Sequence, residues 1–160
     1  MKKVAVVAVL VLALVLTSVA FAANLSKASG QGRLNQGRTF SFHAQERNDG
    51  SVTGNGVLVI PQQGAENIRI KFDIDCLNSD GQSAVMSGTT TESNVWPEDY
   101  AVWFKVVDNG EGAKASGPDQ MTFIYADASE LIDDCSVDYN DLDPVGVPLV
   151  DIIAGNVQVK

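Results

Sequence analysis

The sequence predicts an all-β protein, a single antiparallel β-sandwich of seven or eight strands, with a partly closed β-barrel as the alternative. Three observations lead to this fold class. Residues 68–76 alternate apolar and polar side chains with the period of a half-buried strand. Short segments rich in Val, Ile, Thr and Phe recur along the chain, separated by Gly, Asn and Asp. No convincing long helix follows the N-terminal apolar segment.

The central element is a predicted hairpin over residues 67–92, with a polar turn at residues 78–81. Burial of the four largest apolar side chains of its first strand contributes roughly 6–12 kcal/mol before chain entropy is subtracted. A slip of one residue would move the charged side chains between them into the core, so the register is strongly specified. The side chains expected to point inward are Ile68, Ile70, Phe72, Ile74 and Cys76.

A second hairpin is predicted before it. Residues 39–46 alternate aromatic and polar side chains, and an Asp-Gly turn leads into a return strand over residues 51–60. Gly54 and Gly56 in the return strand indicate a bulge or close packing. The other expected elements are a frayed start at 23–29, strands at 30–34, 101–108, 120–126 and 155–160, and a helical turn at 128–132.

Residues 1–22 have the features of a signal peptide. Lys2 and Lys3 precede an uncharged apolar run, and Ala20-Phe21-Ala22 is a small-x-small cleavage signal. Cleavage after Ala22 leaves residues 23–160 as a single all-β domain of 138 residues, secreted or periplasmic. An uncleaved membrane anchor is the alternative, because the run nearly reaches spanning length.

The charge excludes some partners. The formal charge of the chain is −9, and it becomes −11 once Lys2 and Lys3 are removed. Such a surface repels nucleic acid and anionic membranes, so neither is an expected partner. The acids are concentrated late in the chain: residues 23–97 hold seven acids and six bases, whereas residues 98–160 hold 13 and three.

Cys76 and Cys135 are the two cysteines, and their number fits an oxidising compartment. We expect them to form a disulfide, which would stabilise the fold by about 4 kcal/mol on the chain-entropy model. The alternative is that each is a reduced and buried side chain.

An acidic run provides the candidate metal site. Residues 127–143 contain seven carboxylates and no base. Calcium takes six to eight oxygen ligands, often from one loop, although the spacing here is not that of an EF-hand. A solvated acidic loop is the simpler interpretation. The candidate ligands are Asp134, Asp138, Asn140, Asp141 and Asp143.

Trp96, Tyr100 and Trp103 are the candidate ligand-binding residues. Three aromatic side chains this close in sequence can form a stacking platform for a glycan or another polymer. The alternative is that one or two of them pack over the end of the core.

Catalysis is not expected. His43 is the only histidine, and the alternation of its strand places it on the outer face. No serine in the sequence lies in a nucleophile-elbow pattern. Zinc is not expected either, because one histidine and two cysteines oxidised to a disulfide cannot supply a normal set of zinc ligands. Paired carboxylates could serve a glycosidase, but 20 acids in a β-fold produce such pairs by chance.

A resemblance to a known family rests on several segments of the chain. These segments are SGQGRL, TFSFHAQERNDGSVTG, IDCL-x5-SAVMSGT, VVDNGEGAKASGPDQ and GNVQVK. The chain resembles an uncharacterised family of small exported bacterial β-domains over nearly all of residues 23–160. The resemblance implies an exported all-β domain. It implies no catalytic residue and no ligand.

These observations predict an exported, non-catalytic binding or structural module without a resident cofactor, and with an extracellular glycan or protein as its partner. A calcium-stabilised or glycan-binding module is the alternative, and a small hydrolase is a distant third.

Overall fold

The structure, a computed structural model, describes residues 25–126 and 148–160. All of the described strands pair antiparallel in one sheet, whose order is β10-β1-β2-β3-β4-β5-β6-β7-β9, and β8 pairs with β6 beside this path. Two short 3₁₀ turns, Asn35–Gly37 and Gly112–Lys114, are the helical elements of the described part. The strands are β1 Lys27–Arg33, β2 Thr39–Glu46, β3 Val52–Ile60, β4 Ile68–Ser79, β5 Ser83–Ser93, β6 Ala101–Val107, β7 Gln120–Met121, β8 Tyr125–Ala126, β9 Val150–Asp151 and β10 Ala154–Val159.

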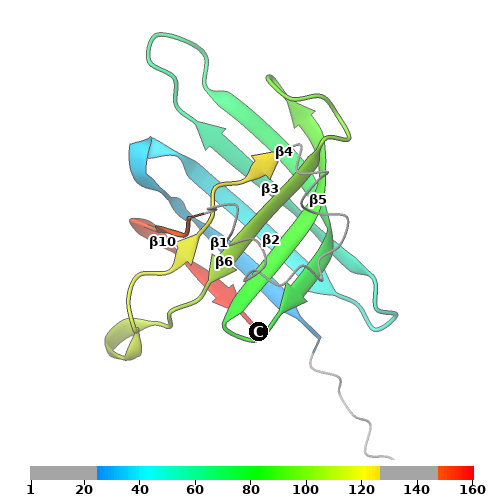
Figure 1. Cartoon of the computed structure of the whole chain (residues 1–160), viewed down its shortest axis with the longest axis vertical. Helices are drawn as coiled ribbons and strands as arrows, with labels where there is room; N and C mark the ends of the chain where they lie inside the picture. The colour runs from blue at the N-terminus through cyan, green and yellow to red at the C-terminus, as the bar shows by residue number, and fades with distance from the viewer. Residues whose placement is uncertain (1–24, 127–147) are drawn as a thin grey trace, which may run out of the picture.

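The all-β class is confirmed, and the sheet is strongly curled into a half-barrel (Figure 1). A sandwich has two sheets, whereas every described strand here belongs to one. The reason lies in the connections: each strand from β1 to β6 pairs with the next one, and β10 returns to pair with β1. Within residues 25–126 and 148–160, no strand therefore starts a second sheet.

The concave face of the sheet holds the core, where glycines alternate with aromatic rings. Gly30, Phe42, Gly56 and Phe72 lie directly opposite one another on β1 to β4. A Cβ atom on Gly30 would lie 2.8 Å from the ring of Phe42, and one on Gly56 would overlap the ring of Phe72. The glycines therefore make room for rings on the crowded inner side of the curl.

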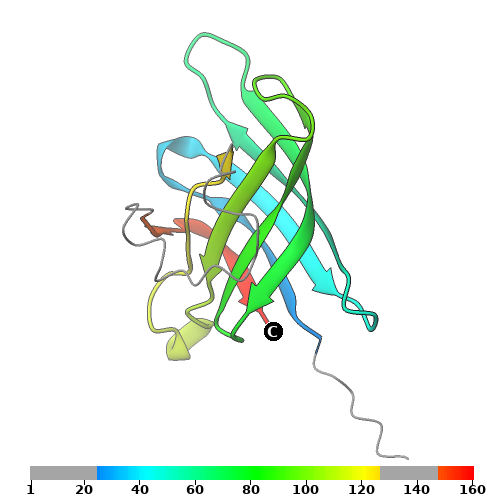
Figure 2. The ribbon, with the colours of Figure 1, turned by 45° about the vertical axis from the view of Figure 1, so that its right-hand side comes forward.

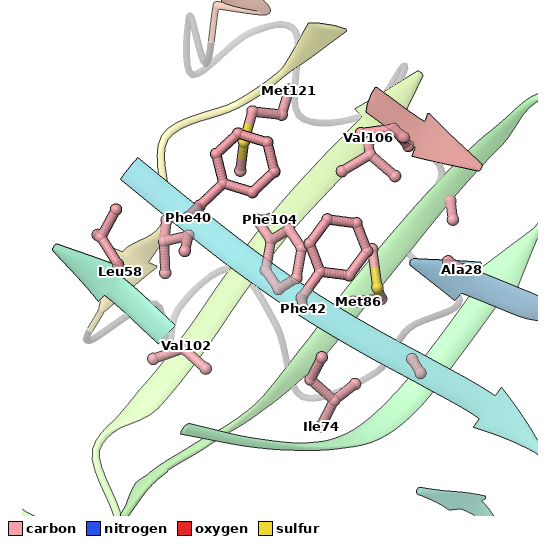
Figure 3. Close-up of a cluster of buried hydrophobic side chains, with 14 of the residues drawn as sticks. Ala28, Phe40, Phe42, Leu58, Ile74, Met86, Val102, Phe104, Val106 and Met121 are labelled. Carbon is pink, nitrogen blue, oxygen red and sulfur yellow. The ribbon is translucent and has the colours of Figure 1, made fainter. Parts of the chain in front are cut away.

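The rings pack edge to face in the middle of the core. The ring centroid of Phe104 on β6 lies 5.2 Å from that of Phe42 and 5.8 Å from that of Phe72, with interplanar angles of 70° and 69°. Met86 lies opposite Phe104 in the β5–β6 pair, and Figure 3 shows both in this cluster with Phe42. Aromatic pairs of this geometry stabilise the fold beyond the area that they bury.

The predicted elements match the structure closely where alternation is strong. β2 has the predicted bounds, and β3, β4, β5, β6 and β10 differ from them by one or two residues at an end. Two expectations are wrong. Residues 27–29 belong to β1, where they pair with β2, instead of fraying. Residues 120–126 form two two-residue strands, β7 and β8, instead of one.

A bulge in β4 corrects the predicted orientation of Cys76. The register of the β4–β5 pair shifts between Ile74 and Cys76, so that Cys76 lies opposite Ser87 and Leu77 lies opposite Met86. Leu77 packs on the core, and half-buried Cys76 therefore points to the outer face. Trp103, which lies opposite Ser87 on β6, shares that outer face and is only 2% exposed.

Three carboxylates accept hydrogen bonds from β10, the strand at one end of the sheet order. We call them the carboxylate seam: Asp108, Glu111 and Asp119. Asp119 is 8% exposed, and its two oxygens accept hydrogen bonds from the backbone N–H of Val157 and of Asn109, at 2.7 and 2.9 Å. Asp108 accepts one from the N–H of Val159 at 3.1 Å. Figure 2 shows the loop after β6 lying beside β10. Side chains therefore satisfy an edge that would otherwise need another strand.

Candidate binding groove on the outer face

The outer face of the sheet carries polar side chains in rows that cross the strands. Register places one row on β10, β1, β2, β3 and β4, and a second row next to it on the same strands. The side chains of a row stand on adjacent strands about 4.8 Å apart. The first row is Gln158, Ser29, His43, Asn55 and Asp73, and the second is Asn156, Gln31, Ser41, Val57 and Lys71.

The surface is hollowed over these rows. A hollow of about 430 Å³ spans β10, β1, β2 and β3. The side chains that point into it are hydroxyls, carboxamides and one imidazole, and none of them carries a formal charge at neutral pH. Its lining is Ser29, Gly30, Gln31, Ser41, Phe42, His43, Asn55, Asn156 and Gln158.

A second hollow, of about 310 Å³, continues the first toward β5. The two share Ser41 and Asn55, so together they form one groove, which we call the outer groove. This half contains the charged side chains Arg69, Lys71 and Asp73. From β10 to β4 the outer groove crosses five strands, a width of about 19 Å at the usual strand spacing.

The β10 end of the outer groove is held by the carboxylate seam. Glu111 accepts hydrogen bonds at Oε1 from the carboxamides of Asn156, at 3.1 Å, and Gln158, at 2.9 Å. These two side chains are therefore oriented before a ligand arrives. The hydroxyl and amide groups on β1 to β3 have no such partner among the described residues and face water.

Among the described residues, one of the two cationic side chains at the β4 end of the groove is paired with an acid and the other is not. Lys71 Nζ lies 2.5 Å from Glu92 Oε2. The hydrogen bond from Lys71, its charge and the charge of Arg69 lower the pKa of the Glu92 carboxyl. Arg69 is exposed and makes no ion pair within the described ranges, while its backbone N–H donates to Asn94 Oδ1 at 3.0 Å. The guanidinium of Arg69 is thus the available cation of the groove.

His43 is exposed on the outer face, as alternation predicts. Ser29 and Asn55 flank it on the neighbouring strands, and the hydrogen bonds of the described part include none from its ring. A Ser-His-Asp site needs an acid that orients the imidazole and a nucleophile bonded to it. Two serines lie near His43 in sequence. The hydroxyl of Ser51 donates to Asp49 Oδ1, and Ser41 lies in the adjacent row.

The three predicted aromatic residues do not form one platform. Trp103 is buried within the outer side of the sheet, where a ligand cannot stack on it. Trp96 and Tyr100 are half-buried neighbours on the β5–β6 loop, with ring centroids 6.2 Å apart, and Trp96 also packs on the core. Thr90 holds this loop through its hydroxyl, which accepts from the N–H of Tyr100 and donates to the carbonyl of Pro97.

The predicted calcium ligands and one half of the predicted disulfide lie outside the described residues: Asp134, Asp138, Asn140, Asp141, Asp143 and Cys135. The described residues contain no cluster of three or more His, Cys, Asp or Glu side chains suited to a metal ion. The signal-peptide segment 1–22 is also outside them. Within residues 25–126 and 148–160, no helix has the length and apolarity needed to cross a membrane.

The outer groove was missed from the sequence, although its signal is present. The residues of each row stand at the outward positions of five strands, and the sequence predicted inward positions for two of these strands, β2 and β4. Pairing registers are needed to align them, because Gln158 and Ser29 are far apart in the chain. Comparison of the chain with family models, curated proteins and solved structures finds no match.

Proposed function

We propose that the protein is an exported, non-catalytic binding module that holds a glycan in the outer groove. Export rests on the N-terminal segment 1–22, and the Cys76–Cys135 disulfide belongs to the same proposal because it suits an oxidising compartment. The carboxylate seam supports a partly closed barrel as the finer description of the fold.

The carrying observation is the chemistry of the outer groove. A chain with a formal charge of −9 presents a hollow of about 430 Å³ whose polar side chains are all uncharged hydrogen-bonding groups. Hydroxyls, carboxamides and an imidazole both donate and accept hydrogen bonds, which is what a polyhydroxylated ligand requires. The rows repeat from strand to strand, so a linear polymer laid across the strands meets similar groups at regular intervals.

Rigidity supports the same conclusion. The groove lies on paired strands and not on loops, and the core beneath it is filled by Phe42 and Phe72. Because the sheet fixes the backbone beneath the groove, the main chain needs little reordering when a ligand binds.

A blocking substitution tests the proposal. Ser41 lies in both hollows of the groove, while Thr39 lies two residues away on the same face of β2 and outside both. Tyrosine suits a strand, so both Ser41→Tyr and Thr39→Tyr should keep the fold. On an array of neutral and acidic glycans, we expect wild type and Thr39→Tyr to share a binding profile, and Ser41→Tyr to lose it at least tenfold. Binding that survives Ser41→Tyr would place the glycan site elsewhere, and an array without any bound glycan would refute the function.

A further inference from the structure

We infer that the ligand of the outer groove is an acidic glycan, whose carboxylate is bound by Arg69 while its sugar hydroxyls lie over β3, β2 and β1. This inference rests on the proposed function and adds the charge of the ligand and its direction in the groove.

The groove has a polarity along its length. Its β10, β1 and β2 side chains are neutral, and the cationic side chains stand at the β4 end. Glu92 engages Lys71, which leaves Arg69 as the cation without an ion pair in the part of the chain that the structure describes. A guanidinium offers paired donors that match the two oxygens of a carboxylate.

Arg69 is also held in place. Its backbone N–H donates to Asn94 Oδ1 at 3.0 Å, and the carboxamide of Asn94 donates to the carbonyl of Asn67 at 3.0 Å. Ile70, the next residue, is fully buried in the core. The start of β4 is therefore fixed, and the guanidinium projects from a rigid strand.

The surrounding charge restricts where an anion can bind. Residues 98–160 hold 13 acids and three bases, and in the part of this segment that the structure describes, the acids lie in the carboxylate seam, the β5–β6 loop and β9. Glu92 and Asp73 are the acids nearest to Arg69 along its own strand and the next. An acidic glycan is thus repelled by the carboxylate seam, the β5–β6 loop and β9, and is oriented with its carboxylate toward Arg69.

The test compares oligogalacturonate and oligomannuronate with their methyl esters, which keep the sugar backbone and lose the charge. Binding of each is measured by titration calorimetry on the full mature chain, for wild type, Arg69→Gln and Arg33→Gln. Arg33→Gln is the matched control, because Arg33 is also exposed on the outer face but lies outside both hollows. Circular dichroism confirms that each variant is folded.

We expect the acid forms to bind about 10- to 100-fold more tightly than the esters, as for a charge-assisted hydrogen bond. Arg69→Gln should reduce the acid forms to the affinity of the esters, and Arg33→Gln should change nothing. Equal affinities for acid and ester, unaffected by Arg69→Gln, would overturn this inference and leave the glycan function standing. If neither form binds to wild type while neutral glycans do on the array, the inference also fails; if nothing binds in either experiment, the proposed function fails with it.

Discussion

Strands β1 to β6 and the carboxylate seam hold the same curled sheet together by different kinds of hydrogen bond. Along β1 to β6, every strand pairs with the next through backbone groups over seven or more positions. At the seam, the N–H groups of Val157 and Val159 meet carboxylates from residues 108 and 119. A backbone ladder spreads its strength over many equivalent bonds, whereas the seam concentrates it in a few side chains. Single substitutions should therefore do most harm at the seam.

The largest expected effect is at Asp119, whose side chain is buried and accepts two backbone hydrogen bonds. Asp119→Ala leaves the N–H groups of Asn109 and Val157 without an acceptor, which should cost about 2–5 kcal/mol in the free energy of unfolding. Urea unfolding followed by circular dichroism measures it. Glu66→Ala, an exposed acid on the β3–β4 loop, is the control and should change little. Equal midpoints for the two variants would show that Asp119 does not hold β10.

A smaller loss is expected inside the ladder, where Gly56 faces the ring of Phe72. Gly56→Ala would overlap that ring, and overpacking of a filled core costs about 1–3 kcal/mol. Gly117 lies in the loop between β6 and β7. A Cβ atom added there would meet nothing within 4 Å, and its φ is not positive, so Gly117→Ala should leave the stability unchanged or raise it slightly. Thermal melts of the two variants compare the sites directly. A Tm of Gly56→Ala equal to that of wild type would mean that the concave face can hold an extra methyl group without strain.

The smallest effect concerns acid at the turn between β4 and β5. Hydrogen bonds from the backbone N–H groups of Ser83 and Gln82 lower the pKa of Asp80 from its usual 3.8. A carboxyl with a lowered pKa stabilises the fold above the unfolded value, and this contribution is lost as pH falls through the folded pKa. Wild type should therefore exceed Asp80→Asn in Tm by a few degrees at most at neutral pH, since Asp80 is exposed. This Tm difference should vanish well below pH 3.8. A difference that persists there would mean that the shape of the turn, and not the charge of Asp80, stabilises the fold.

The same contrast explains what the sequence could predict. The bounds of β2 and the inward positions of β4 up to Ile74 followed from period-two alternation, which depends only on neighbours in the chain. The outward turn of Cys76 did not, because a bulge changes the period within a strand. Asp119 looked like one acid among 20, since its partner Val157 is 38 residues away. Predicting the outer groove would have required the registers of four strand pairs. In the sequence, Arg69 is only one of the charged residues that alternate with apolar ones in β4.

The pairing of β1 with β10 sets the order in which the protein can fold. Strands β2 to β6 find their partners within a short stretch of chain, so each hairpin can form locally and quickly. β1 has one partner close by, but its other partner is β10, which comes far later in the chain, and the N–H of Lys27 donates to the carbonyl of Lys160. The edge of β1 that pairs with β10 is therefore open from the moment β1 forms until β10 has been synthesised. During that interval β1 offers an unpaired edge to any extended chain nearby, and the pairing of the six-residue strand β10 ends the exposure.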